Sequence, residues 1–238
     1  MSTILVMQHH PVEDLGTIEQ ALNERGLTAE YSHSYAGQPV PRDMEGHRGL
    51  VIMGGPMGVY EGDRYPWLND EIRLAERALE AGLPVLGVCL GSQLLAAVLG
   101  SRVRRGEARE IGWHEVRLGG VAAEDPLWRE TAAAGGRFDA FHWHGDIFDL
   151  PRGAGFLASS EQTACQAFVY GGNAYGLLFH MEVTEKGAAD MITSFADEAR
   201  EAGLEPADLL EETPARLAEL HRLGGRVYRN WAGLAAGR

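Results

Sequence analysis

A cysteine between two glycines is the side chain in this sequence best placed for nucleophilic chemistry. Cys89 lies in the segment GVCLG, where Gly87 precedes it and Gly91 follows it. The apolar run PVLGV leads into the cysteine, and a run rich in Ala and Leu leads out of it. This pattern is typical of a buried strand that turns sharply into a helix, because glycines let the two elements approach closely around the nucleophile. The sequence therefore predicts a nucleophile elbow that holds a thiol at the end of a strand.

The predicted elbow would also activate the thiol. The helix that follows would place the positive end of its dipole beneath the sulfur, so we expect it to lower the pKa of Cys89. The N–H of Leu90 would point toward an oxyanion that forms on an attacked carbonyl. The alternative interpretation of Cys89 is a buried structural cysteine. Cys165 has no such setting, and we interpret it as a packing residue of the core.

A cysteine nucleophile needs a base, and the base needs a group that orients it. His180 ends the apolar segment YGLLFH, so we expect it at the same edge of the sheet as the cysteine. Glu182 follows two residues later and lies on the same side of the chain if the extended conformation continues. His180 is thus the candidate base, and Glu182 is the candidate carboxylate that holds its tautomer.

The segments GGP, GVCLGSQ and FHMEV, in this order, resemble those of class I glutamine amidotransferases. The segments HWHGD and QAFVYGGNAYGLLFH are similar to parts of the glutaminase domain of GMP synthase and its stand-alone relatives. The resemblance implies that Cys89, His180 and Glu182 form a catalytic triad. It also implies that Gly55 supplies a second oxyanion-hole N–H beside that of Leu90.

The same resemblance implies a substrate site. It covers about residues 45–185 and is compatible with the N-terminal strand and helix. Gln93 would help to hold the glutamine. His144, Gly145 and Asp146 would lie near its amino-acid end.

The activity that the resemblance implies is hydrolysis of the glutamine side-chain amide through a thioester on Cys89. No cofactor is expected, and ammonia would pass to an acceptor or to a separate synthetase subunit. The same residues would serve a stand-alone γ-glutamyl peptidase or hydrolase, which stays open as the alternative, and a non-enzymatic regulatory module is a minor one. Met181 departs from the family, which commonly has proline there. Since proline would only stiffen the backbone, we expect the triad to persist.

A histidine-rich segment suggests a different chemistry. HWHGD places His142, His144 and Asp146 at a spacing of two, which resembles the start of a zinc motif of metallo-β-lactamases. Ile147 stands where that motif has its next histidine, so no metal site is expected. We interpret the histidine pair at positions 9 and 10 as part of a loop, for which we consider a place at the mouth of the site.

These side chains need an α/β framework that brings strand ends to one edge. The apolar runs TILVM, GLVIM and PVLGVC predict buried strands, and LTAEYSHSY predicts another. Helical spacing between them predicts helices that stop at Gly26 and Gly82. The alternation favours an α/β fold with a largely parallel mixed sheet flanked by helices.

Later in the chain the pattern changes. WHEVRL, DAFHWHGDIF and CQAFVYGG predict strands, and Gly171-Gly172-Asn173 predicts a hairpin turn. We expect a single domain over residues 1–238, with a core of about 1–185. A helical extension would follow over about 186–238, with a second helix entered at Thr213-Pro214.

The composition narrows the class of function. A net charge of −13 at pH 7 argues against nucleic-acid binding, because phosphate repels an acidic surface. Two cysteines are too few for a disulfide framework, and the segment MSTILVMQHHP does not resemble a signal peptide, so a cytoplasmic protein is expected. No segment approaches the roughly 18 apolar residues of a membrane helix, so no membrane association is expected. The oligomeric state is not indicated.

Overall fold

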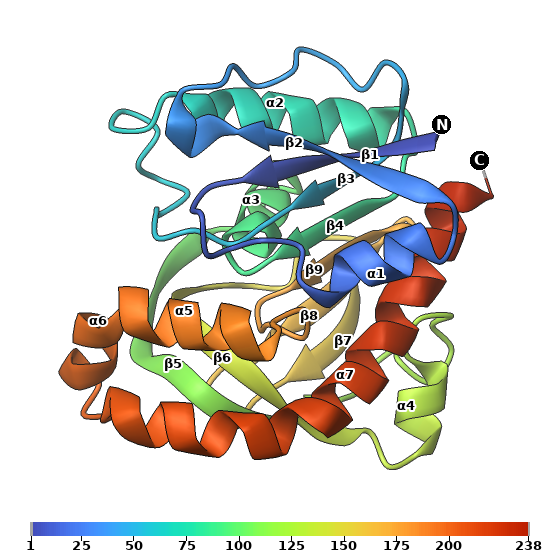
Figure 1. Cartoon of the computed structure of the whole chain (residues 1–238). Coiled ribbons are helices and arrows are strands. Elements are labelled where there is room, and N and C mark those ends of the chain that lie inside the picture. The colour runs from blue at the N-terminus through green and yellow to red at the C-terminus, as the bar shows by residue number, and fades with distance from the viewer. Residues whose placement is uncertain (1, 238) are drawn as a thin grey trace.

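A nine-stranded mixed sheet runs through residues 2–237, the part of the chain that the computed structural model describes (Figure 1). The strands are β1 (Ser2–Gln8), β2 (Leu27–His33), β3 (His47–Ile52), β4 (Val85–Val88), β5 (Val103–Leu118), β6 (Arg137–Phe148), β7 (Gly155–Ser159), β8 (Ala167–Tyr170) and β9 (Ala174–Leu177). They lie in the order β2-β1-β3-β4-β9-β8-β7-β5-β6. Neighbours from β2 to β9 run parallel, and neighbours from β9 to β6 run antiparallel. The predicted mixed α/β fold is confirmed.

Helices cover both faces of the sheet. They are α1 (Thr17–Asn23), the short 3-10 helix η1 (Ser34–Ala36), α2 (Trp67–Glu80), α3 (Leu90–Val98), α4 (Arg129–Ala133), α5 (Glu185–Ser194), α6 (Ala196–Glu201) and α7 (Pro206–Ala236). α2 and α3 pack in one hydrophobic cluster, whereas α1, α5 and α7 pack in another. Figure 1 shows α1 and α7 together on the near side of the sheet. None of these helices, all within residues 2–237, is long and apolar enough to cross a membrane.

Strand β1 shows why the sheet is buried on both faces. Its four central side chains are at most 1% exposed. Ile4 and Val6 belong to the cluster that contains α1 and α7, whereas Leu5 and Met7 belong to the cluster that contains α2 and α3. Successive side chains of a strand point to opposite faces, so a continuous apolar run is what a sheet covered on both sides requires.

The hairpin between β8 and β9 brings the chain back to the parallel half of the sheet. Gly171 and Gly172 have φ angles of 60° and 74°, which glycine adopts without strain. The predicted hairpin is therefore confirmed. β9 then pairs in parallel with β4, and the carbonyl of Leu177 accepts a hydrogen bond of 2.8 Å from the N–H of Cys89. The ends of β4 and β9 thus lie side by side.

The predicted helix start at Thr213-Pro214 is wrong. α7 begins at Pro206, a first-turn position that suits proline, and Pro214 lies inside the helix. An interior proline removes a backbone hydrogen bond and costs about 3 kcal/mol. The helix continues because its apolar face is buried, with Tyr228 and Trp231 fully covered. Each large apolar side chain buried in this way contributes roughly 1.5–3 kcal/mol, so a few of them outweigh the proline.

Candidate active site

Cys89 lies at the sharp turn between β4 and α3, and the predicted strand–turn–helix is confirmed. Its φ of 48° is the only positive value at a non-glycine residue within residues 2–237, and such strain costs on the order of 1–3 kcal/mol. A Cβ on Gly91 would lie 1.9 Å from the Ile52 carbonyl oxygen, and one on Gly87 would lie 2.4 Å from that of Gly91. Only glycine fits at these two positions, which explains both glycines of GVCLG.

Hydrogen bonds hold the strained cysteine in place. Its carbonyl oxygen accepts from Ser92 Oγ at 2.7 Å and from the N–H of Gln93 at 3.1 Å. The sulfur is buried and lies 3.6 Å from the carbonyl oxygen of Trp143. Cys89 also lines a cavity of about 390 Å³. The turn therefore presents the thiol to a cavity large enough for a small ligand.

His180 and Glu182 follow β9 and form a short hydrogen bond. His180 Nδ1 and Glu182 Oε1 are 2.5 Å apart. Glu182 Oε2 accepts from the N–H of Met181 at 3.0 Å and from the hydroxyl of Tyr228 at 3.4 Å. Met181, at the position where the family commonly has proline, therefore supplies a hydrogen-bond donor to Glu182 that proline could not supply, because proline has no N–H. Nε2 of His180 is buried without a hydrogen-bond partner among residues 2–237.

Burial and neighbouring charges set the protonation of Cys89 and His180. Burial raises the pKa of the Cys89 thiol, against opposing interactions with His180 and the N–H of Leu90. The prediction that the helix lowers this pKa is wrong. The loss of water around a buried thiolate destabilises it more than the helix N-terminus stabilises it. Burial alone would lower the pKa of His180, but Glu182 and Cys89 raise it well above its ordinary value. His180 therefore binds a proton readily, and in that form it stabilises a thiolate.

The GGP turn after β3 lies against α3 and is anchored by His9. Nδ1 of His9 is 3.0 Å from the carbonyl oxygens of both Met53 and Gly54. In a trans peptide the N–H of Gly55 points away from the Gly54 carbonyl, and so away from His9. A Cβ on Gly55 would lie 3.0 Å from Leu90 Cδ2. The structure thus brings together the two residues expected to supply the oxyanion-hole N–H groups.

His9 belongs to a buried network that the sequence analysis missed. The histidine pair does follow β1 in a loop, but His9 is 0% exposed, so a place at the mouth of the site is wrong for it. Its Nε2 lies 2.7 Å from Glu71 Oε2, and Ser34 Oγ donates to Glu71 Oε1 at 2.7 Å. Trp67 stacks on the ring at 5.4 Å. Burial alone would lower the pKa of His9, but Glu71 leaves it raised.

The four expected substrate-binding residues line the same cavity as Cys89. They are Gln93, His144, Gly145 and Asp146. Gln93 Nε2 lies 3.4 Å from the Asp146 carbonyl oxygen, which links α3 to β6 across the site. Burial, together with nearby histidines, lowers the pKa of His144 to about 3, so its ring is neutral.

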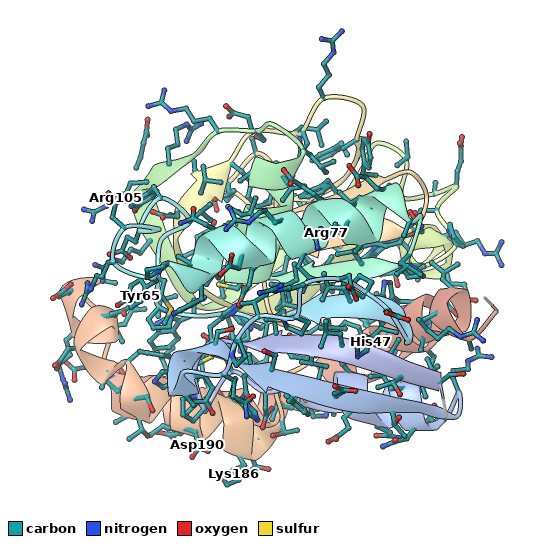
Figure 2. All side chains as sticks on the ribbon, turned by 90° about the horizontal axis from the view of Figure 1, so that it is seen from above. His47, Tyr65, Arg77, Arg105, Lys186 and Asp190 are labelled. Atoms are coloured by element: carbon teal, nitrogen blue, oxygen red, sulfur yellow. The ribbon has the colours of Figure 1, made fainter. Side chains whose placement is uncertain are left out.

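Two arginines of β5 line the cavity near His144, Gly145 and Asp146. Arg105 and Arg109 both line it. Arg105 is exposed and interacts with Tyr60 and Asp146. Figure 2 shows Arg105 at the same end of the molecule as Tyr65. The positive charge of the cavity therefore lies beside the HGD segment.

The histidines of HWHGD do not form a metal centre in the described structure. The rings of His142 and His144 have centroids 5.7 Å apart. His142 Nδ1 is 3.0 Å from the Ala140 carbonyl oxygen, and burial holds its pKa well below the ordinary value. Within residues 2–237 no group of three or more His, Cys, Asp or Glu side chains is arranged to hold a metal ion.

Four glutamates of the cavity carry no sequence motif and were missed: Glu13, Glu61, Glu107 and Glu198. Glu13 lies in the loop before α1 and is 6% exposed. Burial raises its pKa to about 7, although the charge of His180 acts to lower it. Glu198 lies on α6, and its Oε2 accepts a hydrogen bond of 3.3 Å from Trp143 Nε1. The cavity therefore has acidic side chains as well as the arginines of β5.

Comparisons with known proteins show the family of the chain. A family model described as glutamine amidotransferase class-I matches residues 12–199. The chain belongs to the class I glutamine amidotransferases. The resemblance predicted from the sequence is thereby confirmed. A glutamine amidotransferase-like protein of Salmonella typhimurium, YfeJ, is 32% identical over 197 residues, which cover 82% of this chain and 81% of that protein.

Solved structures extend the likeness over nearly the whole chain. A glutamine amidotransferase from Thermotoga maritima is 36% identical with a TM-score of 0.87, over 97% of this chain and 98% of that one. Another, from Methylobacillus flagellatus, is 26% identical with a TM-score of 0.88, over 98% of this chain and 95% of that one. GMP synthase of Thermomicrobium roseum is 38% identical over 146 residues, which cover 61% of this chain but 25% of that enzyme. This amidotransferase thus matches about a quarter of the length of GMP synthase.

Proposed function

We propose that this amidotransferase hydrolyses the side-chain amide of glutamine through a γ-glutamyl thioester on Cys89 and releases ammonia for an acceptor. One observation carries the proposal: the strained Cys89 and the turn that contains Gly55 line one cavity, and the hydrogen-bonded pair of His180 and Glu182 is buried with His180 interacting with the cysteine. A structural cysteine or a regulatory module would not require a strained backbone at the cysteine together with a histidine that interacts with its sulfur and is itself held by a carboxylate.

In the first step, the Cys89 sulfur bonds to the amide carbon of glutamine. The thiol proton passes to His180, and negative charge develops on the carbonyl oxygen. The N–H groups of Gly55 and Leu90 stabilise that charge. His180 then gives its proton to the leaving nitrogen as the carbon–nitrogen bond breaks. Ammonia leaves, and the γ-glutamyl group stays on the sulfur as a thioester.

In the second step, water attacks the thioester carbon. His180 takes a proton from the water, the carbon–sulfur bond breaks, and glutamate leaves. Glu182 accepts the hydrogen bond of His180 Nδ1 throughout, so Nε2 faces the reacting atoms. The contacts of Met181 and Tyr228 hold that carboxylate in place.

The amino-acid end of glutamine belongs at the HGD segment in this proposal. Gln93, Gly145 and Asp146 line that part of the cavity, and Arg105 adds positive charge there. A positive charge suits the α-carboxylate of glutamine. The side-chain amide then reaches toward Cys89.

The relation to GMP synthase supports transfer of the ammonia to a separate synthetase subunit. The second candidate is a stand-alone γ-glutamyl hydrolase, and one observation favours it. Phe195 and Glu198, from the C-terminal part of the chain, line the cavity themselves, so the site has walls without a second protein. Both cysteines are free, and the compartment that we propose is the cytoplasm.

Steady-state kinetics of the purified chain tests the proposed function. We expect glutamine to be hydrolysed, with a kcat/KM within a hundredfold of that on γ-glutamyl dipeptides. A dipeptide preference of a hundredfold or more, about 2.7 kcal/mol of differential transition-state binding, would replace transfer by the hydrolase. The absence of turnover on every γ-glutamyl compound, with the cysteine also unreactive to a glutamine-like electrophile, would reject both.

A further inference from the structure

Glu13 is a buried carboxylate for which the proposed reaction has no use. Its side chain is 6% exposed, lines the cavity, and makes no hydrogen bond to any described residue from 2 to 237. A buried carboxylate without a partner costs several kcal/mol unless another group compensates its charge. The side chain is therefore open to a ligand in the cavity.

Glu13 lies close to the turn that precedes Gly55 and to the segment that contains His180, which in the proposed reaction protonates the leaving nitrogen. A Cβ on Gly54 would lie 2.1 Å from Glu13 Oε2, so the carboxylate packs on the turn that precedes Gly55. The same loop is tied to the other half of the triad, because Thr17 N–H donates to the Glu182 carbonyl oxygen at 2.8 Å. The carboxylate thus lies between the oxyanion turn and the segment that carries the base.

Glu198 faces the same part of the cavity from the C-terminal helices. Its Oε2 accepts from Trp143 Nε1 at 3.3 Å, which holds the carboxylate toward the site. Phe195 precedes α6 and packs against His10 with ring centroids 5.1 Å apart, which ties this helix to the loop that contains Glu13. The arginines of the cavity lie on β5, where Arg105 interacts with Asp146 and Arg109 forms an ion pair of 3.1 Å with Glu201 of α6.

Several charged groups act on the Glu13 carboxyl. Burial raises its pKa to about 7, His180 and His9 act to lower it, and Glu182 and Glu198 act to raise it. His180 gives up its proton to the leaving nitrogen during the proposed reaction. At that moment the positive charge moves from His180 to the nitrogen of the tetrahedral intermediate, which stays positive until the carbon–nitrogen bond breaks and neutral ammonia or amine leaves.

We propose that Glu13 and Glu198 form a subsite for an ammonium group on the leaving-group side of Cys89. The inference rests on the proposed function and names the chemistry that the subsite recognises. Two sources can supply the ammonium group. One is the ammonium ion that forms from the ammonia released from glutamine. The other is the free ammonium group of a diamine attached through its second nitrogen to the γ-carboxyl of glutamate.

Three substrates distinguish these sources. They are glutamine, the γ-glutamyl amide of 1,4-diaminobutane, and the γ-glutamyl amide of n-pentylamine, which has the same length without the charge. kcat/KM is measured at pH 8, where the Glu13 carboxyl is ionised, for the wild type and for Glu13→Gln and Glu198→Gln. Glu107→Gln is the matched control, since Glu107 also lines the cavity but is exposed on β5. Inhibition of glutamine hydrolysis by ammonium chloride is compared with inhibition by sodium chloride.

If the ligand is the charged end of a leaving group, the wild type should prefer the diamine amide over the pentylamide by at least tenfold. Glu13→Gln and Glu198→Gln should each remove most of that preference, and Glu107→Gln should keep it. If the ammonium ion is the ligand, the two amides react alike, and ammonium inhibits the wild type at least fivefold more than it inhibits Glu13→Gln.

The subsite is overturned if neither the amide preference nor the ammonium inhibition responds to the two substitutions. It is also overturned if Glu107→Gln has the same effect, or if Glu13→Gln lowers kcat/KM equally on all three substrates. Any of these results with active wild-type protein leaves the thioester mechanism intact. Loss of the mechanism itself would appear as an inactive wild type whose Cys89 resists a glutamine-like electrophile. Glu198 is half-buried on α6, so Glu198→Gln tests the subsite even if Glu13→Gln does not fold.

Discussion

At the residue scale, burial raises the pKa of one and by itself would lower the pKa of the other of the two groups that exchange a proton in the proposed reaction. It raises the pKa of the Cys89 thiol, whereas the charge of Glu182 reverses its effect on His180. Such a coupled pair shares one proton, and its titration belongs to both groups together. Glutamine would therefore meet a thiol that ionises by transfer to its neighbour, not one already ionised by the helix end.

The two cysteines should differ sharply in reactivity. A diazo-ketone analogue of glutamine should label Cys89 and leave Cys165 unmodified, because burial raises the pKa of Cys165 to about 12 with no histidine to oppose it. Peptide mapping by mass spectrometry measures the site of labelling. Cys89→Ser should retain at most trace turnover, and Cys165→Ser serves as the active control. Label on Cys165, or equal label on both, would contradict the assignment of the nucleophile.

Glu13 should make the fold less stable as the pH rises. Its pKa is raised from 4.5 to about 7 in the folded protein, so the unfolded chain loses this proton first and stability falls between about pH 4.5 and pH 7. The loss amounts to at most about 3 kcal/mol. Urea unfolding at pH 4 and pH 8 should show Glu13→Gln gaining stability over the wild type at the higher pH. Glu107→Gln is the exposed control, and an identical pH dependence of Glu13→Gln and wild type would refute the burial effect.

Motif spacing predicted some of these residues and not others. Cys89, His180 and Glu182 could be found because a strand end, a short spacing and a reactive type coincide in the sequence. Glu13 and His9 stand in a loop without a pattern, and their burial depends on contacts with distant segments. A signal did exist for Glu71, which interrupts the apolar face of α2 and so needs a buried partner.

At the scale of elements, one network joins the ends of β1 and β3 to α2 beneath the oxyanion turn. His9 follows β1, its Nδ1 contacts the Met53 and Gly54 carbonyls after β3, and its Nε2 contacts Glu71 on α2. The orientation of the Gly55 peptide is therefore set by three elements together. The sequence showed these elements but not their connection, because the connection runs through side chains.

Loss of this anchor should affect the transition state more than substrate binding. His9→Ala removes the donor that faces the Gly54 carbonyl, so we expect kcat to fall about 10- to 100-fold while KM changes little. Steady-state kinetics on glutamine measures the separation. His10→Ala, which leaves the contacts to the turn intact, is the matched control. A purely structural role would instead lower the amount of folded protein and leave its kcat unchanged.

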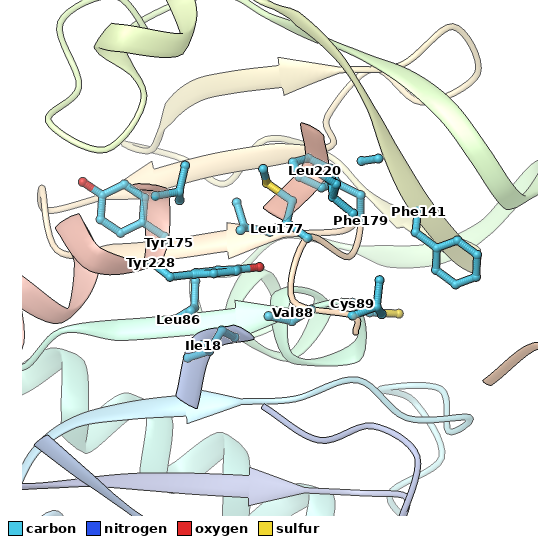
Figure 3. Packing of buried hydrophobic residues seen from close by; sticks show 14 of the residues in the cluster. Ile18, Leu86, Val88, Cys89, Phe141, Tyr175, Leu177, Phe179, Leu220 and Tyr228 are labelled. Atoms are coloured by element: carbon cyan, nitrogen blue, oxygen red, sulfur yellow. The ribbon is translucent and has the colours of Figure 1, made fainter. Parts of the chain in front are cut away.

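The proposed triad contacts the last long helix as well. Figure 3 shows Tyr228 of α7 lying across Leu86, with its hydroxyl toward the end of the sheet where Cys89 lies. That hydroxyl donates to Glu182 at 3.4 Å. Tyr228→Phe should lower kcat by up to about tenfold, the value of one hydrogen bond, with the unfolding midpoint nearly unchanged. Unaltered kcat in a folded variant would show that the carboxylate is oriented without α7.

At the scale of the whole molecule, the C-terminal helices that follow residue 185 pack into the same hydrophobic core as the segment before it. Side chains of α5 and α7 belong to the same hydrophobic cluster as Cys89 and the central strands. The sequence predicted helices here because their apolar spacing is local. It could not show which surface they cover, since that depends on the complete sheet.

A chain that ends at residue 205 should therefore not fold, although every motif lies before that point. It lacks the buried side chains of α7, among them Leu220, Tyr228 and Trp231. At roughly 1.5–3 kcal/mol for each large apolar side chain, the loss reaches the 5–15 kcal/mol by which domains are stable. Circular dichroism and urea unfolding test this expectation. A cooperative transition in the shortened chain, with Cys89 still labelled by the electrophile, would contradict it.

The contact between Tyr228 and Glu182 has a consequence for the order in which the protein is made. On the ribosome α7 emerges after every other element that the structure describes, and until it docks, both the sheet face and the triad carboxylate are incomplete. A nascent chain would therefore carry the nucleophile, the base and the oxyanion turn without working as a catalyst. Synthesis itself would delay the onset of amide hydrolysis, and fragments from interrupted translation would not consume glutamine.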